Sequence, residues 1–126
     1  MRWRITVAIL LLVFLPLGGG LMRRTTQARC DRIEAPLLSM LQALRKGEAA
    51  KRSLLDEAII SWQASRLYFS TLTDHERIDN VNQAFARIEA FLEKEEWAEA
   101  QAELSSLLAL LERLRDTDRL FLRNLL

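Results

Sequence analysis

Cysteine, histidine, proline and glycine are all scarce in this sequence of 126 residues, and each scarcity excludes a class of structure. The single cysteine, Cys30, has no partner for an internal disulfide, and the single histidine leaves no zinc-ligand spacing. Arg29 stands where a lipidated cysteine would need a small residue before it. Only two prolines and four glycines are present, so long stretches lack helix breakers. The scarcity of helix breakers favours an all-α domain.

Basic residues form no stripe outside the N-terminal region. Residues 1–30 contain five arginines and no acidic residue, whereas all 17 acidic residues lie after them. The electrostatic footprint of a nucleic-acid-binding protein is therefore missing. The arginines that flank the N-terminal hydrophobic segment are better suited to contacts with lipid headgroups.

The N-terminal segment is long and apolar. Residues 5–17 contain only Thr6 as a polar side chain, and the apolar stretch extends to Met22. As a helix, residues 5–22 would span roughly 27 Å, slightly less than the roughly 30 Å hydrocarbon core of a bilayer. We expect residues 1–30 to form a retained signal anchor or transmembrane segment that contacts lipid through residues 5–22. A cleaved secretory signal, ended by Pro16 and the glycines at 18–20, is the alternative, and a buried helix of a soluble protein is a third possibility.

The charges on the two sides of this segment predict opposite orientations in the membrane. Arg2 and Arg4 form a signal-like start, which favours export of the remainder. The more numerous arginines after the segment favour a cytoplasmic domain. We expect a single-pass protein of the cell membrane with an extracytoplasmic helical domain, and secretion after signal cleavage is the alternative.

Four apolar stripes with helical spacing follow Cys30 and define a second region, 31–126. The stripes are Ile33, Leu37, Met40 and Leu44; Leu55, Ala58, Trp62, Phe69 and Leu72; Ile78, Val81, Phe85, Ile88 and Leu92; and Trp97, Ala100, Leu104, Leu107, Leu111 and Leu114. Stripes of this kind can bury one another. The sequence therefore predicts an antiparallel helical bundle of about four helices plus a short C-terminal helix over 119–126, preceded by the N-terminal anchor helix.

Several single residues predict where helices begin and which side chains are buried. Thr73 and Glu76 have the spacing of a capping box, which places a helix N-terminus at Thr73. Pro36 suits the first turn of its helix, where its missing N–H costs little. Trp62 and Trp97 fall on core stripes and are expected to anchor the packing.

The two turn sequences Leu44–Ala49 and Leu92–Trp97 resemble each other at an offset of 48 residues, and the register drifts by one residue afterwards. Each joins two expected helices. Two imperfect copies are too few for a solenoid, so this echo predicts a repeated helical-hairpin motif and nothing larger.

One polar cluster, formed by His75, Glu76 and Asp79, is the candidate interaction or ligand site. His75 and Asp79 are four residues apart and therefore share a helix face. The cluster mainly fits a satisfied helix N-terminus, with ligand or metal binding as the alternative, although a metal would need a third ligand. Asn80 and Asn82 are expected on a solvated face or in a hydrogen bond to a neighbouring helix. Phosphate-binding loops and nucleophile elbows are absent, so we expect no enzyme, no catalytic residues and no cofactor.

The segment Leu72-Thr-Asp-His-Glu-Arg-Ile-Asp-Asn-Val81, followed by Ala86-Arg-Ile-Glu-Ala90 and Glu95-Glu96-Trp97, resembles a bacterial family catalogued as domain of unknown function 4363. The resemblance implies a small membrane-anchored or exported protein with no assigned activity. Members are often encoded beside a multipass membrane protein, which implies a membrane partner. The sequence departs from the family pattern at Pro36 and Ala49.

These patterns together predict a non-enzymatic protein-interaction module at the bacterial cell envelope. Its partners would be the lipid bilayer and a membrane or envelope protein, and not nucleic acid. Apolar residues outside the stripes, such as Ile60 and Tyr68, would supply the docking face. A metal- or small-ligand-sensing domain centred on His75 and Asp79 is the alternative.

Overall fold

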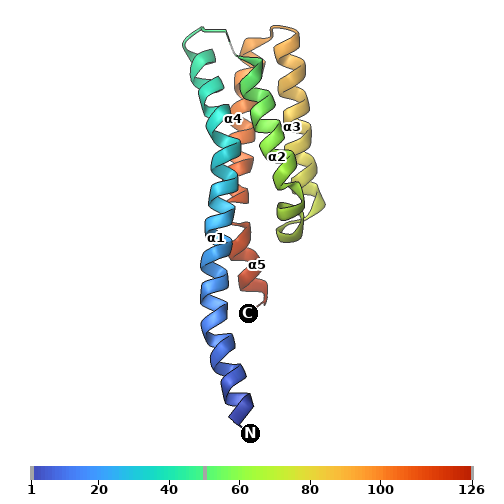
Figure 1. The fold of residues 1–126 in the computed structure, drawn as a ribbon. Coiled ribbons are helices and arrows are strands. Elements are labelled where there is room, and N and C mark those ends of the chain that lie inside the picture. Colours follow the sequence, from blue (N-terminus) through green and yellow to red (C-terminus); the bar gives the residue numbers. More distant parts are fainter. Residues whose placement is uncertain (1, 50, 126) are drawn as a thin grey trace.

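The computed structural model describes residues 2–49 and 51–125, and every regular element among them is a helix. The helices are α1 (Arg2–Arg45), α2 (Arg52–Leu72), α3 (His75–Glu93), α4 (Trp97–Leu114) and α5 (Thr117–Leu125). Successive helices α1 to α4 run up and down beside one another, and α5 continues roughly along α4 (Figure 1). The predicted antiparallel bundle with a short C-terminal helix is confirmed. The N-terminal half of α1 extends beyond the bundle, and both chain ends lie toward that side (Figure 1).

Helix α1 is longer than expected because it joins the apolar segment to the first bundle helix without a break. It continues through Pro16, the three glycines and Cys30 for 44 residues. The division at residue 30 therefore coincides with no change in the backbone. Pro36 lies deep inside this helix and is buried, so its predicted place in a first turn is wrong. The error arose because the helix begins at Arg2 and not near residue 34.

The predicted apolar stripes form the core, with one exception among the large aromatics. Trp62 is almost fully buried, as predicted, and donates its indole N–H to Asn82 Oδ1 at 2.7 Å. Asn82 thus makes the expected bond to a neighbouring helix, while Asn80 is exposed. Trp97 is 42% exposed, because it is the first residue of α4 and only from Ala100 onward does this helix face the core. Its prediction as a core anchor is wrong.

Two turns close the bundle at the end away from the apolar segment, and they share one geometry. Gly47 follows α1 with a φ of 74°, and Glu95 follows α3 with a φ of 57°. The next amide in each turn donates back to the helix, from Glu48 to Ala43 O and from Glu96 to Phe91 O, both at 2.9 Å. This pattern is the Schellman motif, in which a left-handed residue ends the helix.

The echo between the two turns extends along both hairpins. Buried positions of α1 and α3 correspond at the offset of the turns, and buried positions of α2 and α4 correspond one residue further on. The pairs are Cys30 with Ile78, Ile33 with Val81, Leu37 with Phe85, Met40 with Ile88, Leu55 with Leu104, Ala58 with Leu107, Trp62 with Leu111, and Ser65 with Leu114. The two hairpins therefore share their turn geometry and a set of equivalent buried positions.

The remaining two boundaries differ from expectation by one or two residues. Asp74, and not Thr73, caps α3, since its Oδ1 accepts the backbone N–H of Arg77 at 3.1 Å. Thr73 instead ends α2, where its N–H donates to Phe69 O. Helix α5 begins at Thr117, two residues before the expected start at Arg119.

Candidate functional site

The N-terminal half of α1 is the largest unusual surface of the molecule. We call residues 2–21 the leader. Its large apolar side chains are all exposed, and none of its most apolar stretch of 18 residues is buried. This helix is the one element among the described residues that is long and apolar enough to cross a membrane. Such a surface in water would be unfavourable by about 25 cal/mol for each Å². The leader is therefore a candidate single-pass anchor or signal sequence.

The structure separates the three residues of the predicted polar cluster. All three side chains are exposed. His75 and Asp79 line a groove of about 400 Å³ between α2 and α3, together with Gln63, Arg66, Leu67, Ser70 and Ile78. Glu76 points to the other side of α3. We call the groove that His75 and Asp79 line the α2–α3 groove.

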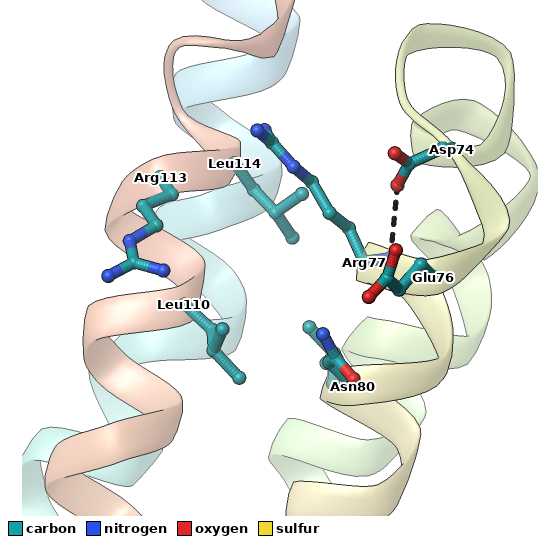
Figure 2. Close-up of a pocket in the computed structure, with 8 residues that line it drawn as sticks. Asp74, Glu76, Arg77, Asn80, Leu110, Arg113 and Leu114 are labelled. Atoms are coloured by element: carbon teal, nitrogen blue, oxygen red, sulfur yellow. Dashed lines mark hydrogen bonds between the residues drawn. The ribbon is translucent and has the colours of Figure 1, made fainter.

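Glu76 instead lines a cleft of about 320 Å³ between α3 and α4 (Figure 2). Arg77 and Arg113 bring positive charge to this cleft, and Leu110 and Leu114 provide apolar surface. The Asp74 carboxylate is engaged by the capping bond at the N-terminus of α3 (Figure 2). Among the described residues, no group of three metal-ligating side chains comes together. The metal-sensing alternative thus gains no third ligand from the fold.

The strongest polar cluster lies elsewhere, where the leader joins the bundle, and sequence reasoning missed it. Arg115, at the end of α4, binds Asp31 Oδ1 at 2.6 Å and also the carboxylate of Glu34 and the amide of Gln27. All three partners lie on α1 at spacings of three and four residues, so they form one face. We call this cluster the Arg115 clamp.

Burial makes the Arg115 clamp more than a surface ion pair. The side chains of Arg115 and Glu34 are 16% and 11% exposed. Hydrogen bonds to Glu34, and secondarily to Asp31, raise the pKa of Arg115 above its ordinary value despite its burial. The guanidinium therefore remains charged and fixes the junction of α4 and α5 to α1.

Cys30 is fully buried next to the clamp. Burial raises the pKa of its thiol to about 12, although the nearby charge of Arg115 opposes this effect. The thiol is therefore protonated and unreactive at neutral pH.

A second contact ties α1 to α2 at the same level. The hydroxyls of Thr26 and Tyr68 lie 2.6 Å apart, and both lie within hydrogen-bond distance of Met22 O, so their two protons serve three contacts. The Arg29 guanidinium stacks over the Tyr68 ring at 4.8 Å and donates to Ser65 Oγ. Tyr68 is thus engaged inside the molecule and is not part of a free docking face.

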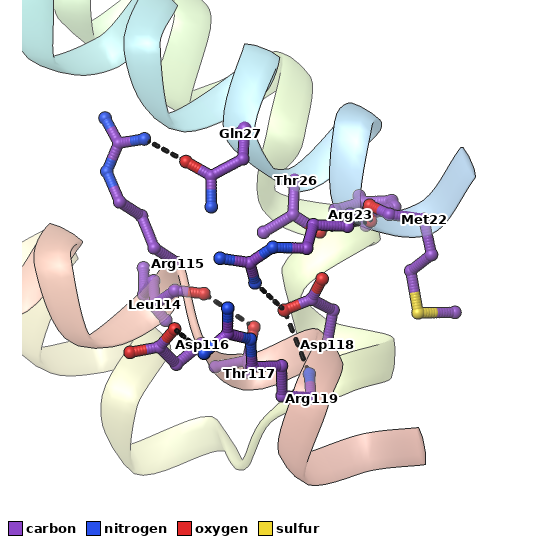
Figure 3. Close-up of polar contacts among 11 residues, drawn as sticks. Met22, Arg23, Thr26, Gln27, Leu114, Arg115, Asp116, Thr117, Asp118 and Arg119 are labelled. Carbon is purple, nitrogen blue, oxygen red and sulfur yellow. Dashed lines mark hydrogen bonds and ion pairs between the residues drawn. The ribbon is translucent and has the colours of Figure 1, made fainter. Parts of the chain in front are cut away.

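A third contact ties α1 to α5. Arg23 Nη1 lies 3.7 Å from Asp118 Oδ1, and Asp118 is only 1% exposed (Figure 3). Thr117 and Asp118 start α5, while Arg115 reaches Gln27 from the preceding turn (Figure 3). Three separate polar contacts therefore surround α1 between residues 22 and 34. We call them together the collar.

The repeat relates the clamp to the predicted site. The positions of Gln27, Asp31 and Arg115 in the clamp correspond to those of His75, Asp79 and Arg66 in the α2–α3 groove. The α1–α4 interface is more tightly packed than the α2–α3 interface, since α1 contacts α4 through more residues than α2 contacts α3. The α2–α3 groove is thus the open counterpart of a closed interface.

Comparison with known proteins gives one match. A family model described as "Domain of unknown function (DUF4363)" matches residues 22–125, which is most of the chain. The matched region begins where the leader ends and includes the collar and all of the bundle. Searches of curated proteins and of solved structures gave no match.

Proposed function

We propose, given that this chain belongs to the family described as domain of unknown function (DUF4363), that it is a membrane-tethered, non-enzymatic interaction module of the bacterial envelope. The observation that carries this proposal is the leader, whose apolar side chains are exposed on a helix that continues into a packed bundle. A bilayer is the environment that removes such a surface from water.

Retention of the leader is supported by the state of the backbone. Residues 18–20, the small residues of the candidate cleavage site, are helical, and the helix must unwind there before a peptidase can bind the chain in an extended form. The collar holds the helix immediately after this point. A retained leader makes a single-pass anchor, and the signal-like charges before it favour a bundle outside the cytoplasm.

The collar gives the anchor a mechanical role. Because the collar ties α1 to α2, α4 and α5, the bundle cannot pivot freely about the point where α1 leaves the membrane. The bundle is therefore presented at a fixed height and rotation above the bilayer. A fixed presentation suits recognition of a partner that is itself held in the membrane.

The docking face of this module is the α2–α3 groove. Leu67 lines the groove and is 80% exposed, and Ile60, two turns earlier on α2, is 66% exposed. Asp79, His75 and Arg66 add polar groups of both signs at the rim. An apolar centre with a polar rim is the composition of a protein interface. The partner is therefore a protein with an exposed apolar helix face and complementary charges.

Three arginine substitutions separate the anchor from the docking face. Leu12→Arg places a charge in the middle of the leader, at a cost of about 2.5–3.5 kcal/mol on insertion scales, and it should release the chain from membranes during a carbonate wash. Leu67→Arg should leave the chain in the membrane fraction. Leu38→Arg, at another exposed leucine of α1, is the matched control.

Docking is then measured by photo-crosslinking in cells from an unnatural residue at position 67. We expect one discrete adduct, which Asp79→Arg abolishes and which does not form from position 38. Equal adducts from both positions would contradict a specific groove. A soluble wild-type chain with its leader intact would contradict the anchor.

Reaction of Ile60→Cys with a membrane-impermeant thiol reagent on intact cells tests which side of the membrane the bundle faces. Labelling is expected for a bundle outside the cytoplasm.

A further inference from the structure

Helix α5 lies along the leader. Phe121 of α5 and Phe14, Gly18 and Met22 of α1 line a shared apolar groove of about 290 Å³. The remaining lining residues are Leu11, Leu15 and Gly19. A Cβ added at Gly18 would meet no other atom within 4 Å, so this groove is open. We call it the leader–α5 groove.

The start of α5 is fixed at the level of Arg23 through the buried carboxylate of Asp118. From there α5 runs toward the N-terminal end of α1, as the ribbon shows (Figure 1). Its second turn therefore lies beside residues 14–22, which are the last turns of the apolar stretch. An apolar stretch that ends in the membrane at Met22 brings the side chains of α5 to the same depth.

The composition of α5 suits the boundary between lipid tails and headgroups. Leu120 is 45% exposed, and Phe121 faces the leader. Arg119 and Arg123 are exposed on the same short helix, and Arg24 is exposed on α1 nearby. Apolar side chains beside arginines suit a segment at the membrane interface, because the apolar groups enter the lipid while the arginines reach the headgroups.

We infer that α5 is a second membrane contact, which lies in the interface of the leaflet beside the leader and binds anionic lipid. A lipid acyl chain fills the leader–α5 groove, and Arg24, Arg119 and Arg123 bind headgroup phosphates. This inference rests on the proposed membrane anchor and extends it from one contact to two.

Charge and length favour lipid over a protein as the occupant of this groove. Asp118, the acidic residue of α5, is buried against Arg23, so the exposed charge of this helix is positive. A negative leaflet surface attracts each such residue. The apolar stretch of about 27 Å is also shorter than the roughly 30 Å hydrocarbon core, and local thinning of the bilayer around such a stretch would bring lipid headgroups closer to α5.

Collisional quenching by bromolipids measures the depth of both contacts in one protein. The full chain carries Cys30→Ala, which removes the buried native thiol, and one new cysteine with a fluorophore at position 12, 120 or 60. It is placed in nanodiscs of phosphatidylcholine and phosphatidylglycerol. Position 12 reports the leader, position 120 reports α5, and position 60 is an exposed apolar control on the bundle.

We expect quenching at position 120 to be clearly above background and weaker than at position 12, because Leu120 lies in the first turn of α5, near the level of Arg23, whereas position 12 lies well inside the leader. Position 60 should show none. Quenching at position 12 without quenching at position 120 would overturn the role of α5 and leave the anchor standing. Absence of quenching at position 12 would overturn the anchor, and the role of α5 with it.

A charge-reversed variant tests the lipid class. Arg119→Glu combined with Arg123→Glu should reduce quenching at position 120 to the level of position 60, while position 12 keeps its value. Both arginines are exposed, and among the described residues the ion pair of Arg119 with Asp116, at 3.9 Å, is the one that the exchange would remove. The fold should therefore tolerate the exchange. Quenching at position 120 that is unchanged by charge reversal, or equal in pure phosphatidylcholine, would overturn the binding of anionic headgroups.

Discussion

The two hairpins of the bundle share their turn geometry and differ in how they contact each other. α1 with α2 and α3 with α4 share the Schellman turn and equivalent buried positions. Where the start of the first hairpin meets the end of the second, the Arg115 clamp closes the interface. Where α2 meets α3, the equivalent positions remain exposed in a groove. The two hairpins thus form two related interfaces, one closed by a buried ion pair and one left open as a groove.

The shared core should respond equally in both hairpins. Leu55 and Leu104 are equivalent and fully buried, so Leu55→Ala and Leu104→Ala should each lower the free energy of unfolding by about 2–5 kcal/mol. Urea unfolding of the full chain in detergent, followed by circular dichroism and by tryptophan fluorescence, to which Trp62 contributes the buried indole, measures both. Each variant should unfold in one transition. Two separate transitions would show that the hairpins are independent units.

The closed and open interfaces should respond unequally to loss of one charge. Glu34→Gln removes the charged partner of Arg115 from a buried site and should cost about 2 kcal/mol. Asp79→Asn, in the exposed groove, should change stability by less than about 0.5 kcal/mol. The same unfolding experiment compares them. Equal losses would mean that the groove is also a structural contact, which would contradict its role as a free docking face.

The equivalent positions Cys30 and Ile78 differ in that only the thiol ionises. The folded thiol has a pKa of about 12 against an ordinary value of 9.0, so above pH 9.0 the unfolded chain releases a proton that the folded chain keeps. Stability should therefore fall with rising pH, by about 1.4 kcal/mol for each pH unit. Urea unfolding at pH 8 and pH 10 tests this, and Cys30→Ala should remove that part of the slope. An identical slope in both proteins would contradict the buried thiol.

Much of the bundle was predictable because it depends on local spacing. The stripe from Ile78 to Ile88 was predicted correctly, since a helix face is set by residues three and four apart. The errors at Thr73, Pro36 and Trp97 concern element ends, where several adjacent residues are able to cap or begin a helix. The length of α1 was not predicted, because three glycines, which are weak helix formers, separate the apolar segment from the first stripe.

The candidate site was harder to predict because it depends on tertiary contacts. Arg115 lies more than 80 residues from Glu34 in the sequence, and no local pattern links them. The spacing of Gln27, Asp31 and Glu34 on one helix face was a usable signal for a polar interface. His75 and Asp79 do share a face, as predicted, and their role in binding stays a prediction.

The two turns offer the finest test of the repeat, because their geometry is the same and their residues are not. Glycine adopts a positive φ without steric cost, whereas glutamate does not. Gly47→Ala should therefore destabilise the bundle by about 1 kcal/mol, and Glu95→Gly should stabilise it by a similar amount. Thermal unfolding of both variants in detergent measures the two shifts, with Glu48→Gly as a control at a turn residue without a positive φ. A loss of stability in Glu95→Gly would mean that the second turn depends on the glutamate side chain. The two turns would then be stabilised by different interactions despite their shared backbone geometry.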